Sequence, residues 1–252
     1  MKRFLGLARF GWPLFLLCLA PLALAQDERS VTSPDGQTEF RLFLAQPEPG
    51  ALFRLAYQVL FHGKLLLDTS FLGLEMHNQE PILGANLGLT SSHANSGAHY
   101  NSLTAEYMQN GSLGRRLNIE VRAYNNGVAF RYVVPTSLPV EDFQLDDEST
   151  EFSFAREGGT APFGHGSDLP VLVEQRGIGW VAISEVSTKD WPRMTLMATE
   201  PKTLMTRLAR LPKDPSLAMH ARTPVISSWR VISISSTREH LLDSGLLSAL
   251  EN

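Results

Sequence analysis

An alternating hydrophobic pattern between Arg115 and Pro135 constrains the fold of this chain more than any other feature. Two runs of alternating apolar residues flank Asn125-Asn126-Gly127, which are residues that tolerate a positive φ angle. Pro135 ends the second run because it has no amide hydrogen to give to a β-ladder. The pattern therefore predicts an antiparallel hairpin, and one buried face is formed by Leu117, Ile119, Val121, Ala123, Val128, Phe130, Tyr132 and Val134.

Similar short segments with turn residues between them recur along the chain. The alternation in 52–59 predicts a half-buried strand, and His62-Gly63-Lys64 turns it into a second strand at 65–67. Many short antiparallel strands are typical of a sandwich or barrel, so we predict an all-β fold in one domain. The other strand candidates are 151–154, 171–174, 179–184, 195–198, 203–209 and 229–235.

A helical pattern is found at the end of the chain. Thr237 can cap a short C-terminal helix that starts at Arg238 and is terminated by Gly245. The apolar stripe of this helix can continue through Leu246, Leu247 and Leu250.

The first 25 residues predict export. Basic residues precede an apolar run at 10–24, which closes with Ala23-Leu24-Ala25, so we expect a signal peptide cleaved after Ala25. The alternative, a retained membrane anchor, is disfavoured because the run is short for a bilayer span and is interrupted by Pro13 and Pro21. The mature domain is then 26–252, without a membrane span and without cysteine, and its location is periplasmic or secreted in a bacterium.

Charge and motif content exclude several function classes. The chain has 22 basic and 26 acidic residues and a net charge of −4, which lacks the basic excess that nucleic-acid binding needs. No phosphate-binding glycine loop, dinucleotide fingerprint or H-E-x-x-H motif is present. The seven histidines have no spacing that would aim two imidazoles at one metal. Asp146-Asp147-Glu148 could supply calcium ligands, but without a calcium-loop pattern we expect a solvated strand edge or turn there.

Three tryptophans of the predicted mature domain could stack on sugar rings, because an aromatic plane suits the apolar face of a pyranose. Trp180 and Trp229 lie in strand patterns, and we expect them in the core. Trp191 lies in a loop after a strand, which makes it the candidate for substrate binding, with burial in the core as the alternative.

The order of several motifs resembles the N-terminal domain of glycoside hydrolase family 97. The most specific stretch is Arg122-Ala123-Tyr124-Asn125-Asn126-Gly127-Val128-Ala129-Phe130-Arg131-Tyr132. The similarity covers essentially the whole mature chain. The other segments that carry it are Ser33-Pro34-Asp35-Gly36, Leu72-Gly73-Leu74, Ile183-Ser184-Glu185, Trp191-Pro192-Arg193-Met194, Thr223-Pro224 and Ser228-Trp229-Arg230-Val231-Ile232.

The resemblance implies a β-super-sandwich of the galactose-mutarotase type, which in the family precedes a catalytic (β/α)8 barrel. Family members are calcium-dependent α-glucosidases or α-galactosidases of the bacterial envelope, and their catalytic carboxylates lie in the barrel. One calcium ligand is expected from the N-terminal domain, and Glu185 is the residue here that matches its motif. The alternative for Glu185 is an ordinary exposed glutamate.

Two departures from the family pattern bear on function. The sequence ends near Asn252, where the family continues into the barrel, so the acid and base carboxylates of glycoside hydrolysis have no counterpart. The segment 154–171 is also shorter than the family's loop between these strands, and that loop helps to shape the active-site rim.

Three functional hypotheses follow. The first is a stand-alone, non-catalytic β-sandwich associated with carbohydrate, such as an α-glucoside or α-galactoside. The second is half of a split hydrolase, in which a separate (β/α)8 barrel completes a calcium site that Glu185 shares. The third, a mutarotase-like enzyme, rests on fold analogy alone.

Overall fold

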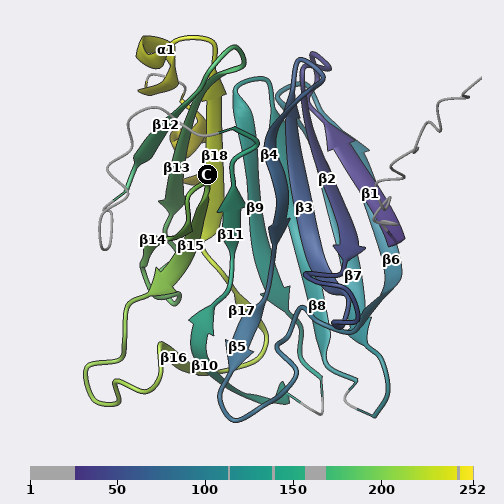
Figure 1. Cartoon of the computed structure of the whole chain (residues 1–252). Helices are drawn as coiled ribbons and strands as arrows, with labels where there is room; N and C mark the ends of the chain where they lie inside the picture. Colours follow the sequence, from purple (N-terminus) through teal and green to yellow (C-terminus); the bar gives the residue numbers. More distant parts are fainter. Residues whose placement is uncertain (1–25, 113, 138–139, 157–168, 243–244, 252) are drawn as a thin grey trace, which may run out of the picture.

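The chain folds into layers of antiparallel β-strands, with two short helices at one side (Figure 1). The computed structural model describes residues 26–112, 114–137, 140–156, 169–242 and 245–251. The predicted signal peptide and most of the 154–171 segment lie outside the described residues. None of the described helices is long and apolar enough to span a membrane.

The described residues of the first half of the chain form nine strands. They are β1 (Gln26–Thr32), β2 (Thr38–Ala45), β3 (Arg54–Phe61), β4 (Lys64–Phe71), β5 (Leu74–Met76), β6 (Leu87–Ser96), β7 (Tyr100–Gln109), β8 (Arg116–Tyr124) and β9 (Gly127–Val134).

Nine more strands and both helices lie in the described part of the second half. They are β10 (Asp142–Glu148), β11 (Glu151–Ser153), β12 (Val171–Gln175), β13 (Gly179–Val186), β14 (Met194–Glu200), β15 (Thr203–Leu208), β16 (Met219–Arg222), β17 (Val225–Ile226), β18 (Trp229–Ser235), α1 (Arg238–Leu242) and α2 (Leu246–Glu251).

A large sheet forms one layer, in the order β12-β13-β18-β9-β8-β7-β6, and β17 pairs with β9. A four-stranded sheet, β1-β2-β3-β4, faces it, and two three-stranded sheets, β16-β10-β5 and β11-β15-β14, extend the architecture (Figure 1). The main core lies between the layers. Phe130 of β9 contacts Phe40 of β2 and Tyr57 of β3 there, with ring centroids 5.7 and 5.1 Å apart.

The predicted hairpin is confirmed as β8 and β9, joined at Asn125 and Asn126. All eight residues assigned to its buried face are at most 1% exposed, because alternate side chains of a strand point to the same face. The predicted all-β sandwich is likewise confirmed.

The predicted C-terminal helix starts at Arg238, as expected. A second short helix, α2, follows Gly245, which has a φ of +65°. Leu246 and Leu250 of α2 pack on the outer face of the large sheet against Trp229 and Val231. Leu247 remains 40% exposed.

Candidate functional site

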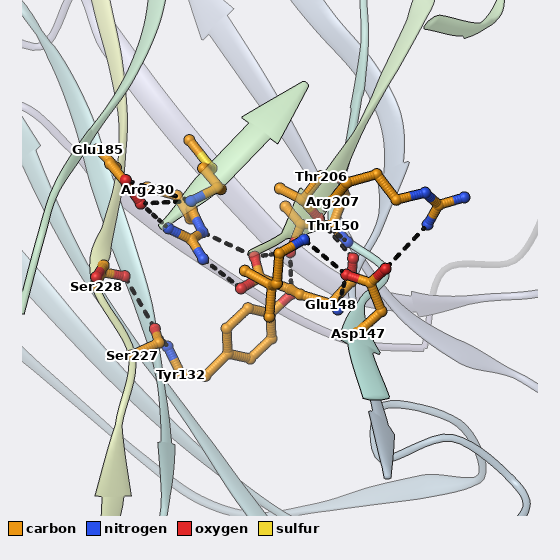
Figure 2. A network of polar contacts seen from close by, with 12 residues as sticks. Tyr132, Asp147, Glu148, Thr150, Glu185, Thr206, Arg207, Ser227, Ser228 and Arg230 are labelled. Carbon is orange, nitrogen blue, oxygen red and sulfur yellow. Dashed lines mark hydrogen bonds and ion pairs between the residues drawn. The ribbon is translucent and has the colours of Figure 1, made fainter. Parts of the chain in front are cut away.

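The most buried polar feature of the described chain is a cluster of one arginine and two glutamates, which we call the Arg230 cluster: Arg230, Glu148 and Glu185 (Figure 2). Their side chains are 0%, 0% and 5% exposed. Nε of Arg230 donates to Oε1 of Glu148 over 2.8 Å, and its Nη1 donates to Oε2 of Glu185 over 2.9 Å. Nη2 of Arg230 donates to Oε2 of Glu148, which makes the pair bidentate.

The sheet layers bring these three residues together. Glu185 of β13 stands directly opposite Arg230 of β18 in the antiparallel register. Glu148 comes from the end of β10, in a separate small sheet. Arg230 has the same parity along β18 as the core residues Ile232 and Ile234, so its side chain enters the interior. The Arg230 cluster therefore links two sheets through the core.

Neutral hydroxyl groups add further hydrogen bonds to the cluster. Oγ1 of Thr150 donates to Oε1 of Glu148 over 2.7 Å, and the hydroxyls of Tyr132 and Thr150 lie 2.5 Å apart. Thr206 donates its hydroxyl to the backbone carbonyl of Glu148 over 2.6 Å. Ionised groups removed from water need such partners to offset their lost hydration.

The electrostatics of the cluster keep its arginine charged. Burial alone would lower the pKa of Arg230, but the charge and hydrogen bonds of Glu148, together with the charge of Glu185, outweigh it and raise that pKa above its ordinary value. Burial raises the pKa of Tyr132, and the adjacent Glu148 carboxylate raises it further, so this phenol stays neutral. The cluster holds two carboxylates against one guanidinium.

Asp147 forms a second ion-paired group beside the first. Its Oδ1 accepts hydrogen bonds of 2.9 Å from the backbone amides of Leu208 and Glu148, and its Oδ2 lies 3.1 Å from Nη2 of Arg210 and 3.7 Å from Nη1 of Arg207. Burial raises the pKa of Asp147 although these amides and arginines oppose the shift.

The expected solvated acidic triplet is therefore wrong for two of its three members. Asp147 is 3% exposed and Glu148 is fully buried, because the end of β10 runs into the interior, where arginines neutralise both side chains. Asp146 is half-buried and pairs with Nδ1 of His77 over 2.7 Å.

Glu185, the candidate calcium ligand, lies near the end of β13 as a buried ion-pair partner of Arg230, so the alternative of an ordinary exposed glutamate does not describe it. Besides Arg230, its carboxylate accepts long hydrogen bonds from Oγ of Ser187 (3.3 Å) and from the backbone amide of Met194 (3.3 and 3.4 Å). It also lines a pocket of about 460 Å³, together with Arg131, Thr188, Trp229 and α2.

The described residues do not by themselves make a calcium site. They contain no group of three or more His, Cys, Asp or Glu side chains that could hold a metal ion. Calcium prefers six to eight oxygen ligands, and both oxygens of Glu185 already accept hydrogen bonds. Within the described part of the chain, Glu185 could provide at most one edge of such a site.

Trp191, the candidate substrate-binding residue, lies in a loop as predicted, but it is only 4% exposed and belongs to the main hydrophobic core, as the alternative expected. Its ring packs 6.4 Å from that of Phe143, and its Nε1 is buried without a partner in the described chain. Trp191 lines a pocket of about 440 Å³, which we call the Trp191 pocket, together with Lys189, Pro192, Arg210, Met219 and His220. This pocket shares no lining residue with the pocket at Glu185.

The two other tryptophans of the described chain differ in burial. Trp229 is 4% exposed, as expected of a core residue, and its ring lies between the guanidinium groups of Arg122 and Arg131, 4.9 and 4.4 Å from its centroid. Trp180 is only partly buried, and Arg238 lies 5.8 Å from its ring centroid.

Sequence reasoning missed the centre of this site. Arg230 belongs to the motif at 228–232, and its position on the strand carries a further signal. In the alternating strand 229–235, it occupies the same face as Ile232 and Ile234, and a charge on a core-facing position requires a buried partner.

The family model described as "Glycosyl-hydrolase 97 N-terminal" matches residues 31–163 and 156–252. The chain therefore belongs to the glycoside hydrolase 97 N-terminal domain family.

Known relatives are longer than this chain. A protein named "Retaining alpha-galactosidase" from Bacteroides thetaiotaomicron is 27% identical over 156 residues, which are 55% of this chain and 21% of that protein. A glycoside hydrolase family 97 enzyme from Pseudoalteromonas sp. strain K8, solved with acarbose, has a TM-score of 0.70 at 18% identity and covers 83% of this chain and 36% of its own. A structure described as a beta-arabinopyranosidase has a TM-score of 0.71 at 21% identity, covering 84% of this chain and 40% of its own. This chain thus spans well under half the length of these relatives.

Proposed function

We propose that this chain acts as an exported, non-catalytic β-sandwich that associates with carbohydrate, in the manner of a glycosidase accessory domain. Membership of the glycoside hydrolase 97 N-terminal family supports the relation to glycosidases. The observation that carries the non-catalytic assignment is the Arg230 cluster together with Asp147. Glycoside hydrolysis needs two carboxylates that flank the scissile bond, and the buried carboxylates here are held by arginines.

The carbohydrate would bind in the Trp191 pocket. Pro192 and the exposed edges of Trp191 and Met219 would meet the C–H face of a pyranose, and Lys189 and His220, whose Nε2 pairs with Asp142, line the same pocket as polar groups for its hydroxyls. The small exposed fraction of Trp191 means that the ring would form the floor of the site and not a flat external platform.

Trp191→Phe is expected to weaken the binding of maltotetraose to the full chain about threefold to tenfold, because a smaller ring removes part of the floor. Isothermal titration calorimetry measures this change. Trp180→Phe is the matched control, since Trp180 lies outside the pocket, and it should leave affinity unchanged. Equal affinities in all three proteins would restrict Trp191 to a packing role.

A second candidate function is half of a split hydrolase. It is favoured by Glu185, whose pocket of about 460 Å³ lies beside α2 and has room for groups from another domain. A separate (β/α)8 barrel would supply the catalytic carboxylates and the remaining calcium ligands, and calcium would bind only in that assembly.

Hydrolysis of aryl α-glucoside and aryl α-galactoside discriminates the two functions. The purified chain is assayed alone and with a separately produced family 97 barrel, each with and without calcium. The accessory function predicts no hydrolysis that depends on this chain. Activity that appears only when chain and barrel are mixed would establish the split hydrolase instead, and activity of the chain alone would contradict both proposals.

Calcium should bind weakly to the chain alone, because one carboxylate cannot supply the six or more oxygens that the ion prefers. Calorimetric titration with calcium chloride is expected to give no micromolar isotherm. A micromolar isotherm that Glu185→Gln abolishes would overturn this prediction, and Asp190→Asn, an exposed acid outside the Arg230 cluster, is the control.

Export is tested by the mass of the mature protein in the periplasm or culture medium. Cleavage after Ala25 predicts a chain that starts at Gln26. An intact Met1 in the membrane fraction would favour a retained anchor.

A further inference from the structure

The four-stranded sheet carries an apolar cluster on the face that points away from the main core. In β2, Leu42 and Leu44 lie in the main core, whereas Phe43 and Ala45 belong to a separate small cluster with Ala56. This separation follows from the two-residue period of a strand. The small cluster therefore lies on the outer side of the four-stranded sheet, where Phe43 and Ala45 keep only 6% and 8% of their surface exposed.

A groove of about 430 Å³ lies over this cluster, and we call it the outer-face groove. Its lining includes Phe43, Ala45, Gln46, Gln58, Thr69 and Phe71. Phe43, Ala56 and Phe71 occupy one row across β2, β3 and β4 in the observed register. Two phenyl rings thus stand on either side of a residue whose side chain is a single methyl group, and Ala56 is fully buried beneath them. This arrangement gives the groove an aromatic floor.

Polar groups along the groove retain free hydrogen-bonding capacity. Nε2 of Gln58 donates to Oδ1 of Asp68 and Oγ1 of Thr69, and Nε2 of Gln46 donates to the carbonyl of Ala51. The Oε1 atoms of both glutamines and the carboxylate of Glu28 accept no hydrogen bond from the described part of the chain. The groove therefore presents acceptors to a ligand that is rich in hydroxyl donors.

The charges around the groove disfavour ionic ligands of either sign. Glu28 and Asp68 repel an anion. A cation would meet Arg54, whose guanidinium already lies 5.2 Å from the ring centroid of Phe71. A neutral ligand with both hydroxyl groups and an apolar face satisfies these conditions.

We propose that the outer-face groove is a second carbohydrate site, which takes a short neutral oligosaccharide on Phe43 and Phe71 and holds its hydroxyls through Gln46, Gln58 and Glu28. This inference rests on the proposed carbohydrate association and adds a site distinct from the Trp191 pocket. The two sites share no lining residue.

Amide chemical-shift mapping of the full chain tests the groove directly. Titration with maltotetraose and with panose, up to about 10 mM, is expected to shift the amides of 43–46, 56–58 and 69–71. Tetragalacturonic acid, an anionic oligosaccharide, should not shift them. If only the amides of 189–193 and 209–221 shift, the proposed groove site is wrong, whereas the proposed association with carbohydrate in the Trp191 pocket stands. No shift anywhere would contradict both proposals.

Two variants separate binding from folding. Ala45→Leu adds bulk at the floor of the groove and should lower affinity for this site at least about tenfold. Gln58→Leu keeps the size of the side chain but removes the amide, and should lower affinity about threefold to tenfold. Trp180→Phe, outside both the Trp191 pocket and the groove, is the control and should leave the groove shifts unchanged. Unchanged groove affinity in the folded Gln58→Leu protein would overturn the assignment, whether or not Ala45→Leu folds.

Discussion

Replacing Arg230 by methionine is expected to lower the free energy of unfolding by about 3–5 kcal/mol, because it leaves Glu148 and Glu185 buried without their cation. Methionine keeps most of the side-chain length, so the loss reports mainly on charge. Urea unfolding at neutral pH, followed by tryptophan fluorescence, measures the change. Arg222→Met is the matched control. Its pair with Glu141 is 4.0 Å long and largely exposed, so the cost there should stay within about 0.5 kcal/mol.

The loss in Arg230→Met should depend on pH. Unpaired buried carboxylates bind protons more readily in the folded variant than in its unfolded chain, so the folded variant gains stability as the pH falls. The deficit relative to the unmodified protein should therefore be smaller near pH 5 than at about pH 8. Adding Glu148→Gln should recover part of the loss at neutral pH, because it removes one of the uncompensated charges. A loss below about 1 kcal/mol, or one independent of pH, would contradict the assignment of the cluster as a buried, ionised network.

The β8–β9 hairpin could be predicted from the sequence because the two faces of β8 differ clearly in polarity and turn residues follow it. β18 was predicted at 229–235, as observed, and β13 and β15 were placed to within two residues. The long strands β6 and β7 were missed. β6 carries mostly Gly, Ser, Thr and Asn and lies at the edge of the large sheet. It has no apolar face that would mark it as a strand, and it is recognised in the structure by its pairing with β7. A polar edge strand of this kind leaves little local signal in the sequence.

The Arg230 cluster could not be predicted from the sequence for a related reason. Glu185 and Arg230 are neighbours only through the pairing of β13 with β18, and Glu148 reaches them from another sheet. The acidic triplet at 146–148 was assigned to a solvated edge because local composition cannot show that distant arginines neutralise it. The resemblance to the family makes Glu185 a candidate calcium ligand, and the structure shows which side chains hold its carboxylate.

Gly127→Ala is expected to lower the free energy of unfolding by about 3 kcal/mol or more, since two unfavourable effects coincide at this position. Gly127 has φ of +150°, a conformation that L-residues with a side chain rarely adopt. A Cβ atom there would lie 2.3 Å from the carbonyl oxygen of Ile232 and 2.9 Å from Cα of Ser233. These are backbone atoms of the adjacent β18, so they cannot yield by a rotamer change. Thermal and urea unfolding measure the loss.

Gly63→Ala separates the contact from the backbone conformation. Gly63 also has a positive φ, +71°, but a Cβ atom at this position would meet no other atom within 4 Å, so only the conformational cost of about 1–2 kcal/mol should apply. Equal losses in both variants would show that β18 moves aside without cost. A larger loss at Gly127 would show that close approach of β9 to β18 is required. Because β18 also carries Arg230, that approach would connect the Asn125-Asn126 turn to the placement of the buried charge cluster.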